Sequence, residues 1–213
     1  MIKNSRKAKL WRVAAVLLTL LFLLCAVGCA DKDAESDGAS ILNYENVDVS
    51  IAVRLGEYKG RTVILLDGES EAQAIWRVIG ESSEILEYPK EQVDYYLSQT
   101  RTRVEYYSSV HNVSYEEALK ALGYSNEGAM LEEAKALVAS DLLGIAIRKS
   151  AGIILTDDEK DKLFNKYAEK YAYDWGYNLA YVKDSLKEEV FELMLYDKTS
   201  EYLVKNNTFV VPQ

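Results

Sequence analysis

The stretch that decides the fold is SYEEALKALGYSNEGAMLEEAKALVASDLLGIAIRKSAGIILTDDE, which occupies residues 114–159. It contains two capping boxes, a Ser or Thr followed three positions later by a Glu: Ser114 with Glu117, and Thr156 with Glu159. In such a box the hydroxyl accepts a hydrogen bond from the first helical turn, and the Glu reaches back to the N–H of the capping residue. Gly123 and Gly152 stand where helices usually end, because glycine adopts the left-handed conformation at little cost. The stretch therefore predicts a short helix, a long helix and the start of a third.

The first 28 residues have the pattern of a secretory signal peptide. Five Lys and Arg residues precede Val13, and the segment from Val13 to Val27 is almost entirely apolar. An apolar run of about fifteen residues is short for a membrane-spanning helix but long enough for the core of a signal peptide. We expect this segment to direct export.

The apolar run ends in Ala26-Val27-Gly28-Cys29, which resembles the lipobox of bacterial lipoproteins. The resemblance implies cleavage before Cys29, a lipid on the Cys29 thiol, and anchoring at the outer face of the bacterial cytoplasmic membrane. Several acyl chains anchor a protein stably where a single chain is marginal. The alternative interpretation is an uncleaved signal anchor in which Cys25 and Cys29 are incidental.

The chain is acidic, with 34 Asp and Glu against 25 Lys and Arg and a formal net charge of −9. Loss of the five basic signal residues would leave 20 basic residues and a net charge of −14. Nucleic-acid binding requires a basic surface, so a nucleic-acid partner is excluded. The remaining cysteine would be the lipidated one, so the exported domain is expected to lack disulfides and to depend on packing.

Residues 29–43 follow the signal and comprise the lipidated Cys29 and an acidic, flexible tether. Residues 44–68 form a short β-prone segment, which leads to two alternatives, a β-hairpin or an extended linker. Its first run has alternating apolar residues at Val47, Val49, Ile51, Val53 and Leu55. The second run is Thr62 to Leu66.

Residues 69–213 have the three- and four-residue apolar spacing of helices. Pro89 is expected at the first position of a helix, and the long helix is expected at about Glu127 to Ala151. A break at Asp174-Trp175-Gly176 is expected to precede a last helix from about Leu179 to Lys205. The predicted fold class is mainly α, a multi-helix arm with a short β-hairpin or an extended segment at its N-terminal side.

The sequence offers no set of residues suited to catalysis, metal binding or a cofactor. His111 is the one histidine, in a predicted loop without Cys or His neighbours. No serine has a nucleophile-elbow glycine pattern, and no glycine-rich phosphate loop is present. We therefore predict no catalytic residue, no metal site and no cofactor.

Tyrosine is the unusual residue type, with 16 copies. A tyrosine side chain combines a large apolar area with a polar tip, so it can cover a wet surface that still binds apolar segments. The candidate contacts with a polypeptide client are the tyrosines near helix breaks: Tyr106, Tyr107, Tyr173 and Tyr177. The alternative is that most tyrosines fill the seams between helices.

Three stretches together are similar to trigger factor, a family of ribosome-associated chaperones. The first is LGEYKG at residues 55–60, the second is ILEYPKEQVDYYLSQTRTRVEYY at residues 85–107, and the third covers residues 115–164 with LEEAKALVASDLLGIAI and TDDE. The resemblance implies the C-terminal chaperone domain, in which helical arms form a cradle for unfolded polypeptides. The family's ribosome-binding domain is replaced by the signal and tether, and the stretch between Gly60 and Pro89 is too short for its isomerase domain.

The function expected from these features is that of a lipid-anchored extracytoplasmic chaperone. It would hold unfolded or newly exported polypeptides, contact the membrane through the lipid on Cys29, bind no ribosome, and perform no chemistry of its own. Two alternatives stay open: a foldase related to the prolyl isomerases, and an adaptor lipoprotein that holds one specific partner in the membrane or envelope.

Overall fold

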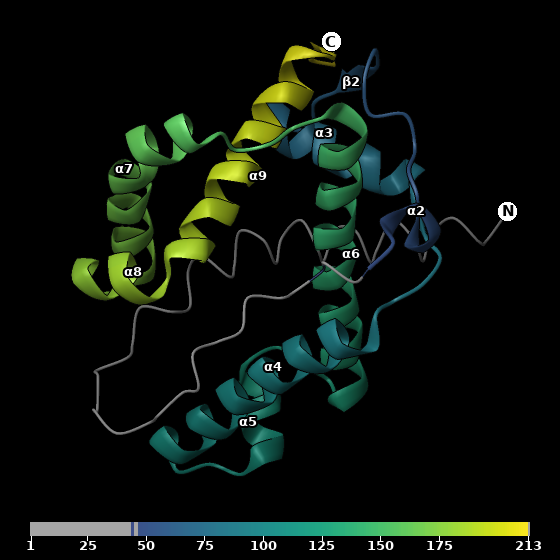
Figure 1. Ribbon diagram of the computed structural model, residues 1–213. Coiled ribbons are helices and arrows are strands. Elements are labelled where there is room, and N and C mark those ends of the chain that lie inside the picture. The colour runs from purple at the N-terminus through teal and green to yellow at the C-terminus, as the bar shows by residue number, and fades with distance from the viewer. Residues whose placement is uncertain (1–43, 45–46, 213) are drawn as a thin grey trace, which may run out of the picture. The chain divides into compact units, whose positions relative to one another are not determined.

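The computed structural model describes residue 44 and residues 47–212 (Figure 1). This part of the chain is mainly helical, as the sequence predicts, with short strands between the helices. The predicted signal, Cys29 and the tether up to residue 43 lie outside the described residues.

The described helices are α2 (Val49–Ala52), α3 (Glu71–Ser82), α4 (Lys90–His111), α5 (Tyr115–Ala121), α6 (Glu127–Ala151), α7 (Asp157–Trp175), α8 (Leu179–Ser185) and α9 (Lys187–Lys205). The described strands are β1 (Val53–Arg54), β2 (Thr62–Ile64), β3 (Glu84–Ile85) and β4 (Thr208–Val210). The long helix α6 has the bounds that the sequence predicts.

Both predicted capping boxes are confirmed. The Ser114 hydroxyl accepts from the Glu117 N–H at 3.3 Å at the start of α5, and the Glu117 carboxylate accepts from the Ser114 N–H at 2.9 Å. The box of Thr156 and Glu159 begins α7 with the same reciprocal pair of bonds. A third box, formed by Ser70 with a Gln three residues on, begins α3.

The β-hairpin considered for residues 44–68 is wrong. Residues Val49–Ala52 form the short helix α2, because the Asp48 carboxylate accepts a hydrogen bond from the Ser50 N–H at 3.0 Å and caps a turn there. The strands β1 and β2 do not pair with each other. Strand β1 pairs with β3, and β2 pairs in parallel with β4, with Thr62 opposite Thr208 and Ile64 opposite Val210.

The single last helix expected from Leu179 to Lys205 is also wrong, because the chain bends at Leu186. The Leu186 N–H closes α8 on the Val182 carbonyl at 3.0 Å, and the Leu186 carbonyl accepts the Val190 N–H at 3.1 Å as α9 begins. The Leu186 side chain packs against the buried residues between α7, α8 and α9. Packing of an ordinary helix former therefore produces this bend. Pro89 precedes α4 as its capping residue, one position earlier than expected.

The described chain divides into two compact units. One comprises residues 55–84 and 144–212, and the other comprises residues 44, 47–54 and 85–143. Helix α6 supplies its first part to the second unit and its last part to the first.

In the first unit, α3 packs against α9, and the β2–β4 pair lies beside the end of α9. The Trp76 ring stacks on Tyr196 with centroids 5.6 Å apart, and the Trp76 indole N–H donates to the Ser200 hydroxyl at 2.9 Å. One cluster of this unit's buried side chains comprises Tyr58, Val63, Ala74, Ile75, Ile79, Ile147 and Leu203.

In the second unit, α4 packs against α5 and the first turn of α6. The buried cluster there comprises Val104, Ala118, Leu119, Tyr124 and Met130. The Asp141 carboxylate accepts hydrogen bonds from the hydroxyls of Tyr44 and Tyr96, both at 2.7 Å. Burial and the nearby Asp141 carboxylate raise the pKa of Tyr44 well above its ordinary value.

Candidate functional site

Helices α7, α8 and α9 form a hairpin in which α8 closes the turn between the two longer helices (Figure 1). The left-handed Gly176 (φ 69°) ends α7 at the break that the sequence predicts, and the Asn178 carboxamide caps α8. The buried core shared by α7, α8 and α9 comprises Ala168, Ala172, Val182, Val190 and Met194. This module carries both surface features that are candidates for function.

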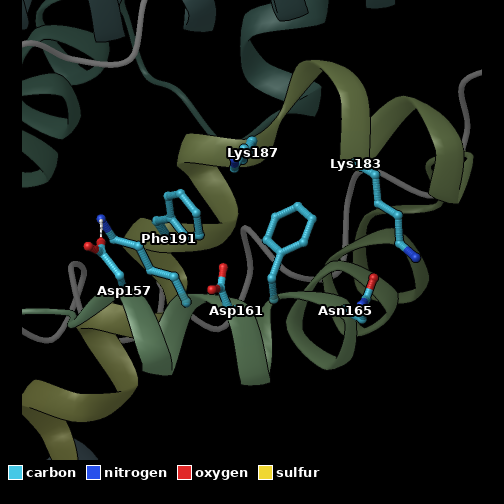
Figure 2. Close-up of a pocket in the computed structure, with 8 residues that line it drawn as sticks. Asp157, Asp161, Asn165, Lys183, Lys187 and Phe191 are labelled. Atoms are coloured by element: carbon cyan, nitrogen blue, oxygen red, sulfur yellow. Dashed lines mark ion pairs between the residues drawn. The ribbon is translucent and has the colours of Figure 1, made fainter.

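The first feature is an open groove with a cavity volume of about 430 Å³, which we call the α7–α9 groove (Figure 2). The residues that line it are Asp157, Lys160, Asp161, Phe164, Asn165, Lys183, Lys187 and Phe191. Phe164 and Phe191 are half-buried and lie with their ring centroids 5.6 Å apart at an angle of 58°. The two rings give the groove an apolar floor.

Lysine side chains cover this apolar floor. The Lys187 ammonium lies 6.0 Å from the centre of the Phe164 ring and 5.5 Å from that of Phe191. The Lys160 ammonium lies 5.3 Å from the Phe191 ring, and it also pairs with Asp157 at 3.6 Å. Such cation–π contacts hold a cation close to an aromatic face while leaving the ammonium accessible to water.

The second feature is a row of aromatic rings around the turn from α7 to α8, which we call the aromatic row. Tyr171 stacks on Trp175 at 5.8 Å and on Tyr177 at 6.3 Å, and Tyr177 contacts Tyr181 at 5.8 Å. Tyr177 and Tyr181 are exposed. Tyr173, two positions after Tyr171 on α7 and therefore on another face of this helix, has 88% of its surface exposed. Aromatic rings held against one another form a surface that loses little conformational entropy when it binds.

Of the four candidate client tyrosines, Tyr177 belongs to the aromatic row and Tyr173 lies on α7 outside it. The other two belong to α4 in the second unit. There Tyr106 is 53% exposed, whereas Tyr107 is half-buried against the local core and its ring lies 4.1 Å from that of His111. His111 is the last residue of α4, so its expected place in a loop is wrong by one residue.

Sequence reasoning missed the groove and three members of the aromatic row. A signal was present, because several of these residues recur at four-residue spacing along the chain, which on α7 places them on one helix face. The spaced pairs are Asp157 with Asp161, Asp161 with Asn165, Tyr171 with Trp175, Tyr177 with Tyr181, and Lys183 with Lys187. Only the packing of α7 on α9, however, brings Phe164 and Phe191 together.

Within residues 44 and 47–212, no helix has the length and apolar character needed to cross a membrane. The same part of the chain contains no group of His, Cys, Asp and Glu side chains placed to hold a metal ion. In the comparisons with known proteins, no family model, no curated protein and no solved structure matches the chain.

Glu159 ties the start of α7 to α9 and makes the stability of this hairpin depend on pH. Its carboxylate accepts from the Lys198 ammonium at 2.5 Å and from the N–H and hydroxyl of Thr156, which together lower the pKa of Glu159 from 4.5 to about 2. A carboxyl group with a lowered pKa stabilises the fold above its unfolded pKa, and this contribution is lost as the pH falls through the folded value.

We expect Glu159→Gln to reduce the dependence of the thermal unfolding midpoint on pH in the acid range. The midpoint of thermal unfolding in the wild type should fall as the pH is lowered from 4.5 towards 2, and the variant should lose less across that window. Glutamine retains the capping box, so the cap itself is preserved. Circular dichroism melts at stepped pH values measure both profiles, and parallel curves would contradict the assignment.

Proposed function

We propose that this protein is a lipid-anchored extracytoplasmic chaperone that holds unfolded or newly exported polypeptides. The observation that carries the proposal is the aromatic row, because Tyr177 and Tyr181 are held in contact with each other and expose apolar area. Exposed apolar surface of this kind is typical of protein interaction sites. The lipobox-like segment that ends at Cys29 supplies the expected anchor, and the resemblance to the helical arm of trigger factor supports the same function.

The chemistry of the aromatic row suits clients without a fixed structure. A tyrosine ring binds an apolar side chain through its face, and its hydroxyl can bond to an exposed backbone group of an unfolded chain. The net charge, −14 after loss of the five basic signal residues, keeps such a surface soluble and attracts basic segments over a distance. Holding a client in this way needs neither a catalyst nor a cofactor.

The test is suppression of aggregation by the full chain reconstituted in phospholipid nanodiscs. A chemically denatured model protein is diluted into a near-stoichiometric amount of chaperone, and light scattering is followed against empty nanodiscs. We expect scattering to fall severalfold. Scattering equal to that with empty nanodiscs, even at excess chaperone, would refute the proposal.

Two double variants locate the activity. Tyr177→Ser with Tyr181→Ser removes apolar area from the aromatic row and should weaken suppression severalfold. The matched control is Ile154→Ser with Val211→Ser, which removes exposed apolar side chains of the same unit outside the row. Equal effects of both double variants would mean that general hydrophobicity and not the aromatic row holds the client.

Crosslinking in membranes separates the chaperone from the adaptor alternative. A heterogeneous set of crosslinked polypeptides is expected for a chaperone, whereas one stoichiometric partner would favour an adaptor. In a prolyl-peptide isomerisation assay, a rate equal to the uncatalysed rate would rule out the foldase alternative.

A further inference from the structure

The two walls of the α7–α9 groove carry opposite charges. Figure 2 shows Asp157, Asp161 and Asn165 along α7 on one side, with Lys183 of α8 and Lys187 of α9 on the other. The Asp161 carboxylate points up into the groove, and the Lys183 chain extends down beside Asn165. Between these walls lies the floor of Phe164 and Phe191.

The charge on the α7 wall is partly neutralised within the wall. Lys160 pairs with Asp157 and contacts Phe191, which leaves Asp161 as the acidic group in the middle of this wall. On the opposite wall the Lys187 ammonium is 5.5–6.0 Å from the two ring centres. A peptide whose carboxylate pairs with Lys187 can therefore place the apolar side chain of its neighbouring residue on the two rings.

The bend at Leu186 produces this arrangement. It ends α8 just after Lys183 and starts α9 at Lys187, so both lysines line the same wall across a break between two helices. A lysine at the first position of a helix is electrostatically unfavourable, because the N-terminal end of a helix dipole is positive. The contacts of Lys187 with the two rings offset this cost.

We propose that the α7–α9 groove binds an extended peptide segment in which an apolar, preferably aromatic, side chain lies between a basic and an acidic residue. The apolar side chain would lie on the floor that Phe164 and Phe191 form together. The acidic residue would pair with Lys187 and Lys183, and the basic residue would pair with Asp161. A volume of about 430 Å³ accommodates a segment of this size. The inference rests on the proposed function, since it names the class of client segment that this chaperone prefers.

The test measures binding of fluorescein-labelled peptides to the full chain in nanodiscs by fluorescence anisotropy. The probe is Ser-Gly-Lys-Phe-Glu-Gly-Ser, and the comparison peptides replace its central three residues by Lys-Ala-Glu, Glu-Phe-Glu or Lys-Phe-Lys. We expect the Ala peptide to bind about tenfold more weakly, since burial of an aromatic side chain contributes at least that factor. The two peptides with like charges should bind about fivefold more weakly than the probe. Equal binding of all four peptides would overturn the proposal.

Charge reversal in the groove provides the decisive variants. Lys187→Glu should weaken binding of the probe about fivefold and strengthen binding of the Lys-Phe-Lys peptide. Glutamate is favoured at the start of a helix, but the variant also loses the contacts of Lys187 with the two rings, so a circular dichroism melt must show that it unfolds at the wild-type temperature. The matched control is Lys166→Glu, an exposed lysine of α7 that does not line the groove. Equal effects of the two substitutions would overturn the proposal.

The double variant Lys187→Glu with Asp161→Lys exchanges the charges of the two facing residues, while Lys183 keeps its charge. Binding of the probe should recover in part relative to Lys187→Glu, because the peptide can lie in the opposite direction. Additive loss in the double variant would overturn the proposal. Aggregation assays on Lys187→Glu separate the two proposals, since suppression that persists while peptide preference is lost leaves the chaperone function intact. Peptide preference without any suppression of aggregation would refute the chaperone function alone.

Discussion

Replacing Leu203 with alanine is expected to lower the free energy of unfolding by about 2–5 kcal/mol, the range for a leucine truncated in a packed core. Leu203 has 0% of its surface exposed and lies near the end of α9 among Ile75, Ile79 and Ile147. The loss includes both the transfer of the missing methyl groups and the cavity left between α3 and α9. Chemical denaturation followed by circular dichroism measures the change.

The matched control for this substitution is Glu201→Ala, two residues earlier on α9 and exposed. An exposed substitution of this kind should change the stability by at most about 0.5 kcal/mol. Similar effects of the two alanines would show that Leu203 does not lie in a tightly packed core.

Gly56→Ala is expected to destabilise the protein by about 1–3 kcal/mol through steric overlap. A Cβ atom at position 56 would lie 2.5 Å from the Ser82 hydroxyl, 2.6 Å from the Ser82 carbonyl oxygen and 2.8 Å from its carbon. Two of these atoms belong to the backbone, so the end of α3 would have to move. The Gly56 N–H also donates to the Ser83 hydroxyl at 2.9 Å, and a shift would strain that bond.

Gly144→Ala is the same type of substitution, but we expect it not to destabilise the protein. At this helical position the added Cβ would meet only the Arg148 side chain at 3.5 Å and the Trp76 ring at 3.9 Å, both ordinary contacts. Alanine in a helix is favoured over glycine by about 0.5–1 kcal/mol, so this variant should be neutral or more stable. Thermal or chemical unfolding of both variants decides the matter, and a stable Gly56→Ala protein would contradict the close approach to Ser82.

The helix boundaries that the sequence predicts correctly are those encoded by local chemistry. The boxes at Ser114 and Thr156 depend on residues only three positions apart, and the left-handed glycines at 123, 152 and 176 act on the backbone at their own position. The stop after Lys205 is likewise confirmed, with Asn206 as the capping residue. Signals of this kind can be interpreted before any tertiary contact is known.

The features that the sequence does not predict depend on partners far along the chain. The alternation from Val47 to Leu55 favours a strand, but the Asp48 cap and the contacts of Val49 and Ala52 with the core produce a helical turn instead. The bend at Leu186 has no local stop signal, because leucine is a good helix former. Packing on the α7–α9 core decides that position.

The candidate site shows the same division between local and tertiary information. The sequence indicates exposed tyrosines around the break at Gly176, because both the break and the nearby tyrosines can be identified from the sequence. Tyr177 of the aromatic row is one of them. The α7–α9 groove cannot be predicted in this way. Phe164 belongs to α7 and Phe191 to α9, so the two rings meet only when α7 packs on α9. The opposite charges of the two groove walls likewise come together only when α7 packs on α8 and α9.

The parallel pairing of β2 with β4 affects the order in which the chain can fold. The adjoining bond from the Arg61 N–H to the Asn207 side chain joins residues 146 positions apart, so the first unit closes only when the last residues of the chain are present. Pairings of such long range form slowly because the loop must be closed first. Most of the second unit, in contrast, is the continuous segment of residues 85–143. During synthesis the second unit can therefore acquire its structure early, and hydrogen exchange during refolding should show protection at Thr208 last.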